Sequence, residues 1–162
     1  MRKADIIPTK VVPLAEAEKI IAQWRVTGRT VAFTNGVFDI IHRGHIFSLS
    51  QAAAEADYLI VGINSDASTK RLKGDSRPVN DEQSRALVMA ALLMVDLVVI
   101  FEEDTPLNVM TTLRPDVIVK GGDYTLDQIV GAKEVMAYGG RVVINPTVEG
   151  FSTTGIIQKM KS

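Results

Sequence analysis

The sequence predicts an α/β fold, with a five-stranded parallel sheet covered by helices on both faces. Short apolar runs alternate along the chain with stretches in which apolar residues recur at helical spacing, which is the pattern of such a sheet. No repeat or low-complexity tract interrupts the alternation. The 162 residues, 46% of them hydrophobic, suffice for one domain with a sizeable core and are too few for two.

The first predicted helix, over residues 14–26, precedes the first strand. Its apolar side is formed by Ala17, Ile20, Ile21 and Trp24. We expect residues 1–28 to form an N-terminal extension whose helix packs on the sheet, or equally covers a partner chain. Residues 29–162 then form the main domain.

Five apolar runs are the predicted strands, at residues 31–34, 58–63, 97–101, 117–120 and 141–145. The helices between and after them are predicted at residues 44–56, 81–94, 106–113, 127–138 and 153–161. Asn80 with Gln83 is predicted to cap the second of these helices. Thr105 is predicted to cap the third, with Pro106 at its first position.

A polar segment follows each strand, at residues 34–39, 64–66, 102–104, 120–124 and 146–154. Parallel sheets bind ligands beyond the carboxyl ends of their strands, so we expect these segments to converge on one site. The exception is the run of three acids at residues 102–104, which we expect to be a solvated turn.

The chain's only two histidines, His42 and His45, stand three residues apart where the first strand leads into a helix. A helix N-terminus there attracts phosphate, and Gly36 and Gly44 allow a phosphate chain to lie against the backbone. Two imidazoles one turn apart can stabilise negative charge developing on one phosphorus. The alternatives are a water-bonded pair at a helix end or part of a metal site. Zinc is the weaker alternative, because cysteine and a third histidine are absent.

Composition excludes several classes of protein. A net charge of −1 argues against binding nucleic acid by neutralising many phosphates. The absence of cysteine excludes disulfides and thiol catalysis, and it suits a reducing compartment. Residues 1–10 lack the apolar run of a signal peptide, and no later run is long enough to span a bilayer. We therefore expect a cytoplasmic protein without nucleic-acid or membrane partners.

Several segments resemble one known family. Thr34-Asn-Gly-Val-Phe-Asp39 followed by His42-Arg-Gly-His45 is similar to the motif of the HxGH nucleotidyltransferase superfamily, which is cytidylyltransferase-like. Lys120-Gly-Gly-Asp-Tyr124 and the run from Glu149 to Ile157 resemble the heptose 1-phosphate adenylyltransferases within it. The similarity extends from about residue 14 to the C-terminus.

The resemblance implies a single Rossmann-like domain, with residues 29–162 as the nucleotidyltransferase domain. It also implies transfer of AMP from ATP to D-glycero-β-D-manno-heptose 1-phosphate, which gives ADP-heptose for the lipopolysaccharide core and pyrophosphate. An acceptor phosphate oxygen attacks the α-phosphorus of ATP in this reaction. The enzyme must therefore hold two highly charged groups in line.

The resemblance also implies roles for individual residues. His42 and His45 are implied to contact the nucleotide phosphates as catalytic residues, with His45 at the reacting centre. A cradle around the phosphates is implied for Thr34, Asn35, Gly36, Phe38 and Gly44. Asp39 is expected to orient a loop or a polar group of the ligand, and a structural turn is an equal alternative.

Two later segments complete the expected nucleotide site. Ser152, Thr153 and Thr154 open the last helix, where they hold the β- and γ-phosphates or serve as an ordinary helix cap. Lys120, Gly121 and Asp123 are implied to lie by the nucleotide and the sugar phosphate. A Gly-Gly turn with a surface lysine is the alternative for this second segment.

Residues 70–85 contain the main basic cluster. The chemistry requires cations for the acceptor phosphate and the departing pyrophosphate, and the candidates are Lys70, Lys73, Arg77 and Arg85, with Lys70 also a candidate catalytic residue. A solvated surface is the alternative for the cluster, and a salt bridge is the alternative for Arg85. Gly74 and its polar neighbours indicate a flap that becomes ordered when substrates bind.

No metal-ligand cluster is expected, because Mg²⁺ would be carried by the triphosphate oxygens of ATP and by water. The expected partners are ATP and a sugar phosphate. The chain has no kinase half, so we expect it to act after a separate sugar kinase, as a homo-oligomer with a dimer as the commonest state.

Two other functions stay open from sequence. The first is a cytidylyltransferase that uses CTP with glycerol 3-phosphate or another small phosphorylated alcohol. Such enzymes commonly carry Arg-Thr-Glu-Gly where this chain has Thr147-Val-Glu-Gly150, and the missing arginine favours ATP. The second is a nucleotide sensor without catalysis, which the intact histidines and basic cluster disfavour.

Overall fold

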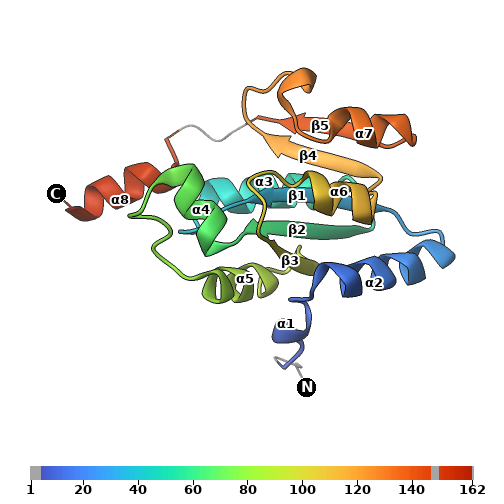
Figure 1. The fold of residues 1–162 in the computed structure, drawn as a ribbon, viewed down its shortest axis with the longest axis horizontal. Coiled ribbons are helices and arrows are strands. Elements are labelled where there is room, and N and C mark those ends of the chain that lie inside the picture. The colour runs from blue at the N-terminus through green and yellow to red at the C-terminus, as the bar shows by residue number, and fades with distance from the viewer. Residues whose placement is uncertain (1–4, 147–149, 162) are drawn as a thin grey trace.

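One parallel sheet organises the protein, which a computed structural model describes over residues 5–146 and 150–161 (Figure 1). The strands are β1 (Val31–Gly36), β2 (Tyr58–Asn64), β3 (Leu97–Phe101), β4 (Val117–Gly121) and β5 (Arg141–Asn145). They lie in the order β3-β2-β1-β4-β5, and every neighbouring pair is parallel. The five predicted strands are confirmed. β1 lies at the centre, so the strand order reverses beside it, where ligands bind to sheets of this kind.

Helices cover both faces of the sheet, as predicted. They are α1 (Ile6–Thr9), α2 (Leu14–Val26), α3 (Arg43–Ala53), α4 (Asp66–Lys73), α5 (Glu82–Ala90), α6 (Leu107–Leu113), the 3-10 helix η1 (Leu126–Gln128), α7 (Ala132–Ala137) and α8 (Thr153–Lys161). The buried residues of α2, α6 and α7 form one apolar core with the sheet. Those of α3 and α5 form a second core on the opposite face. In the described part of the chain, none of the helices has the length and apolar character needed to cross a bilayer.

The residues before α2 border the outer edge of β3. The Val98 N–H donates to the Lys10 carbonyl at 2.9 Å, and the Val12 N–H donates to the Val98 carbonyl at 3.0 Å. The Lys10 ammonium also donates to the Val95 carbonyl at 2.7 Å. α2 then crosses to the sheet and buries Ala17 and Ile21. The N-terminal segment thereby satisfies backbone groups of an edge strand that would otherwise be open to pairing.

Two predicted helices differ from the structure, and two short helices, α1 and α4, were not predicted. The helix predicted over residues 127–138 is divided into η1 and α7, because Gly131 has a φ of +84° that a continuous α-helix does not allow. The helix predicted over residues 81–94 ends at Ala90. α4 lies where the sequence predicted part of a flap, and it begins with the Ser65 hydroxyl accepting the Ser68 N–H at 3.1 Å.

The predicted caps also differ from the structure. The N-cap of α5 is Asp81, whose carboxylate accepts the Ser84 N–H at 2.9 Å, in place of the Asn80 and Gln83 pair. Pro106 occupies the N-cap position of α6 without a side-chain hydrogen bond. The cap therefore lies one residue later than predicted at both helices.

Candidate active site

A cavity of about 360 Å³ opens at the carboxyl end of the sheet, beside β1. Among the predicted residues, its lining includes Thr34, Asn35, Gly36, Phe38, His42, Gly44, His45, Gly121, Ser152 and Thr153. They come from the end of β1, the start of α3, the end of β4 and the start of α8. The fold therefore brings together residues that are more than a hundred positions apart in the sequence.

The two histidines form a stacked pair at the N-terminus of α3. His42 is the N-cap residue, and the ring centroids of His42 and His45 are 3.9 Å apart. The His42 N–H donates to Nδ1 of His45 at 3.4 Å. Because Nδ1 accepts this bond, a neutral His45 carries its proton on Nε2, which can donate to a ligand oxygen. Nδ1 of His42 is buried and has no hydrogen-bond partner among the described residues.

Burial keeps both imidazoles neutral in the free protein. It lowers the pKa of His42, and it lowers the pKa of His45 to about 4 together with the repulsion of a charge on His42. At neutral pH the pair therefore supplies hydrogen-bond donors rather than positive charges. A bound triphosphate favours the protonated form of each ring, because opposite charges raise the pKa of an imidazole.

Two glycines make room for the rings of the site. A Cβ at Gly44 would stand 3.0 Å from Cε1 and Nδ1 of His42, and a Cβ at Gly36 would stand 3.1 Å from the ring of Phe38. Phe38 has a φ of +49°, and its ring meets the His45 ring edge-on at 5.4 Å between centroids. A side chain at either glycine would therefore press on an aromatic ring of the site, and that ring would have to shift.

Ser152 and Thr153, at the start of α8, both line the cavity, and the Ser152 hydroxyl also caps the helix. The Ser152 hydroxyl accepts the Gly155 N–H at 3.0 Å, which is a helix cap. Thr153 lines the cavity, and its hydroxyl donates to the Ile40 carbonyl at 3.4 Å. Thr154 is exposed and does not line the cavity. Residues 147–149, which bear on the choice of nucleobase, lie outside the described residues.

Lys120 lies behind the cavity, where its ammonium donates to Oδ1 of Asn35. Burial lowers the pKa of Lys120 to about 8. The side chain lines a smaller neighbouring pocket of about 140 Å³, together with Tyr124. Asp123 is exposed and lines neither space. Lys120 therefore contacts a residue of the cavity lining, Asn35, whereas Asp123 is not part of the lining.

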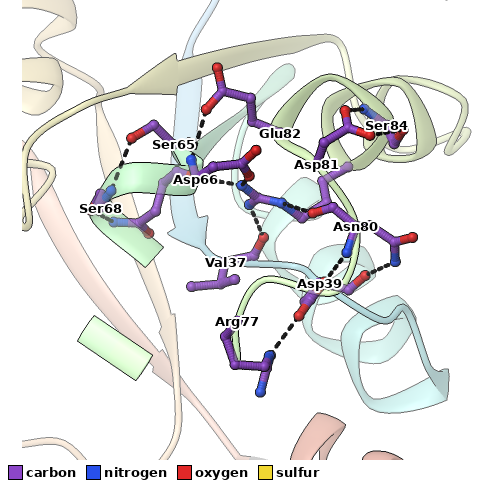
Figure 2. A network of polar contacts seen from close by, with 12 residues as sticks. Val37, Asp39, Ser65, Asp66, Ser68, Arg77, Asn80, Asp81, Glu82 and Ser84 are labelled. Atoms are coloured by element: carbon purple, nitrogen blue, oxygen red, sulfur yellow. Dashed lines mark hydrogen bonds and ion pairs between the residues drawn. The ribbon is translucent and has the colours of Figure 1, made fainter. Parts of the chain in front are cut away.

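In the structure, Asp39 and Arg85 take the structural alternatives that the sequence left open for them. The Asp39 carboxylate is buried and accepts the N–H groups of Val79 and Asn80 at 2.9 Å. It also accepts Nε–H of Arg77 at 2.7 Å, and Figure 2 shows Asp39 between Arg77 and Asn80. Burial opposes its ionisation, yet the hydrogen bonds from Asn80, Val79 and Arg77 lower the pKa of Asp39. Asp39 thus orients a loop and is not a phosphate ligand. Arg85 is 1% exposed and makes four hydrogen bonds to protein acceptors, so in this structure it is not available to an acceptor phosphate.

The rest of the basic cluster lies outside the cavity lining. Lys70 and Lys73 are exposed residues of α4, and Arg77 is paired with Asp39. The acids at 102–104 are exposed, and they also bind α4: the Ser65 hydroxyl donates to Glu102 at 2.9 Å, and Arg71 pairs with Asp104 at 2.7 Å. These acids therefore hold the helix that carries the two lysines.

Three cavity residues were missed by sequence reasoning: Val37, Ser48 and Phe151. Ser48 follows His45 by three residues on α3, so helical spacing could have identified it. No comparable pattern marks Phe151, whose ring lies 4.9 Å from the guanidinium of Arg43. Within residues 5–146 and 150–161, no three His, Asp or Glu side chains form a group that could hold a metal ion.

Known proteins match both the sequence and the fold. A model of the cytidylyltransferase-like family matches residues 33–159. The bifunctional protein HldE of Paramagnetospirillum magneticum is 55% identical over 151 residues, which are 93% of this chain and 31% of that protein. HldE of Rhodospirillum rubrum is 53% identical over 152 residues, with 94% and 31% covered. The chain thus spans about a third of the length of these curated relatives.

Solved structures match the fold. The lipopolysaccharide core biosynthesis protein from Thermoplasma volcanium is 30% identical, with a TM-score of 0.60 over 75% of this chain and 98% of that one. Pantothenate synthetase from Thermus thermophilus, at 17% identity, has a TM-score of 0.63 over 91% of this chain and 67% of its own. The second likeness shows the fold alone.

Proposed function

The chain belongs to the cytidylyltransferase-like family of nucleotidyltransferases, and we propose that it transfers AMP from ATP to D-glycero-β-D-manno-heptose 1-phosphate. The observation that carries the proposal is the stacked pair of His42 and His45 in a cavity bounded by the end of β1 and the start of α8. The choice of heptose is supported by the motifs at residues 120–124 and 149–157. The matching lipopolysaccharide core biosynthesis protein supports the same pathway.

The geometry suits in-line attack on the α-phosphorus. Thr34, Asn35 and Gly36 offer backbone and side-chain polar groups along one wall of the cavity, and Thr153 offers a hydroxyl from α8. His45 would donate from Nε2 to an oxygen of the phosphate under attack, where negative charge increases in the transition state. The acceptor oxygen forms the new bond to phosphorus as the bond to pyrophosphate breaks.

Among the described residues, the cavity lining contains histidine, hydroxyl and amide groups and no carboxylate, which fits an anionic triphosphate. Mg²⁺ would be held by triphosphate oxygens and water, and it would neutralise part of their charge. Lys70, Lys73 and Arg77 remain our candidates for the acceptor phosphate and pyrophosphate. The Nε–H of Arg77 donates to Asp39, and in the described part of the chain neither Nη1 nor Nη2 of Arg77 has a hydrogen-bond partner.

We also infer that the protein acts in the cytoplasm, after a sugar kinase, and as a dimer. The relatives are named bifunctional, and the part of each that this chain does not match is large enough for a second activity. A dimer is the commonest state of such enzymes. Light scattering on the purified chain tests the dimer, and a monomeric mass would contradict it.

Release of pyrophosphate tests the proposed function. The purified protein is supplied with ATP, CTP, GTP or UTP, each with heptose 1-phosphate or glycerol 3-phosphate. We expect rapid release only with ATP and the heptose phosphate. Preference for CTP would support the cytidylyltransferase instead, and binding of nucleotide without release for any acceptor would support a sensor.

A further inference from the structure

Arg85 carries a buried charge that the proposed chemistry does not use. The residue is 1% exposed, although burial of a cation is costly unless its donors are satisfied. Its Nε donates to the Asn80 carbonyl at 3.0 Å and its Nη1 to the Val37 carbonyl at 2.6 Å. Nη2 donates to the Asn64 carbonyl at 2.8 Å and to Asp66 at 2.9 Å. The guanidinium therefore bonds in several directions at once.

These acceptors belong to different segments at the carboxyl edge of the sheet. Val37 lines the nucleotide cavity, Asn64 ends β2, and Asp66 begins α4. Figure 2 shows Val37, Asp66 and Asn80 approaching the same network from separate parts of the chain. A guanidinium can donate to all of them because its N–H groups point outward from three nitrogens in one plane. The three N–H groups of a lysine ammonium are all on one nitrogen, so a lysine could not reach the same acceptors.

The bond to Val37 lies next to a strained residue. Phe38 has a φ of +49°, which a bulky residue adopts only where the surroundings hold it. On its other side, Asp39 is tied to the N–H groups of Val79 and Asn80. The backbone of Phe38 is thus fixed between two anchors, and its ring rests against His45.

We propose that Arg85 is a positioning residue for His45. By holding the Val37 carbonyl, Arg85 fixes the backbone of Phe38, and the Phe38 ring fixes the imidazole in the cavity. Arg85 itself contacts no substrate. Only the kinetic consequence of this inference rests on the proposed function.

The test is to measure the pKa of His45 in the full chain carrying Arg85→Lys, using the NMR signals of the two imidazoles as the pH is varied. Burial keeps the pKa of His45 at about 4, and the charged group in contact with it is His42. Release of Phe38 admits water to the ring, so we expect the pKa of His45 to rise by about one unit or more towards 6.5. The signals are assigned with His42→Ala.

Two further variants separate positioning from general stability. Leu113→Ala opens the core at the end of α6, away from the cavity, and should lower the melting temperature while the pKa of His45 stays near 4. If Arg85→Lys does not fold, Asp66→Asn removes only the ion pair of Arg85 and should give a smaller rise. If the folded variant, Arg85→Lys or else Asp66→Asn, has the same His45 pKa as the wild type, the proposal is overturned.

Kinetics supply a second readout. In Arg85→Lys we expect kcat to fall about 100-fold, as for an active-site group displaced by about 1 Å, with a smaller change in KM for ATP. A purely structural role would lower the melting temperature and leave kcat intact where the variant is folded. The titration needs no substrate, so a wild-type protein inactive with every acceptor would count against the proposed function alone.

Discussion

The imidazoles of His42 and His45 stack at 3.9 Å between centroids, with 27° between their planes. Each ring keeps water from the other, and a proton on one disfavours a proton on the other. The pair is therefore neutral in the free protein at pH 7, and on the proposed function it would meet a nucleotide as hydrogen-bond donors. Its protonation then depends on the charge of the bound ligand.

Removal of His45 tests its part in transfer. We expect His45→Ala to lower turnover by a factor of at least about 100, the scale for losing one preorganised donor to developing charge, with a smaller change in nucleotide affinity. Pyrophosphate release and calorimetric binding of ATP measure the two effects, with circular dichroism as the check on folding. His42→Ala should show the same separation, and near-normal turnover in both variants would refute the assignment.

The low pKa of His45 makes stability depend on pH. Between its folded pKa of about 4 and 6.5, the unfolded chain binds a proton that the folded chain does not. The free energy of unfolding therefore decreases as the pH falls from 6.5 towards 4. Urea unfolding at pH 7 and pH 5 measures the loss, which should be smaller in His45→Gln. Equal losses in the two proteins would show that His45 titrates normally.

Gly44→Ala should separate stability from activity. Alanine favours a helix over glycine by about 0.5 to 1 kcal/mol, so the melting temperature should hold or rise. The added Cβ would stand 3.0 Å from the His42 ring and must displace it, so turnover should fall. Ser50→Ala, on the exposed side of the same helix, is the control that should change neither. Full activity in Gly44→Ala would mean that the ring position is not critical.

Lys120 gives the site an alkaline limit. Its pKa of about 8 means that the ammonium is charged below that pH and loses its charge as the pH rises through it. We expect ATP affinity to fall over this range, because a cation behind Asn35 is lost. Calorimetry from pH 7 to 9.5 should show the fall in the wild type and in Lys133→Gln, which removes an exposed lysine of α7, and not in Lys120→Gln. The same fall in Lys120→Gln would assign it to another group.

Ser152 and Thr153 both line the cavity, but only the Ser152 hydroxyl caps α8, so the two residues should differ in their effect on stability. Thr153→Ala removes a hydroxyl from the cavity lining, so ATP binding should weaken while the melting temperature changes little. Ser152→Ala removes the cap on Gly155 and should destabilise the helix by about 1 kcal/mol. Differential scanning fluorimetry with and without ATP measures both effects. Unchanged ATP affinity in Thr153→Ala would restrict that residue to a structural role.

Sequence alone identified the strands, because buried parallel strands are continuous apolar runs that need no knowledge of their neighbours. It also identified most of the cavity lining, because the carboxyl ends of such strands must share one edge. It missed α4 and did not predict the break at Gly131, because both depend on contacts with residues far away in the chain. Asp104 binding Arg71 is one such contact.

Charged residues show the same division most clearly. Sequence could place Asp39, Arg77 and Arg85 near the site but could not tell which would face a phosphate. That choice depends on burial, because a guanidinium enclosed by carbonyl oxygens no longer meets solvent or ligand. The tertiary structure alone decided that Arg85 is enclosed and that, in the described part of the chain, Arg77 bonds only through Nε. It also decided that burial lowers the pKa of both histidines, so that they are neutral at pH 7 in the folded protein.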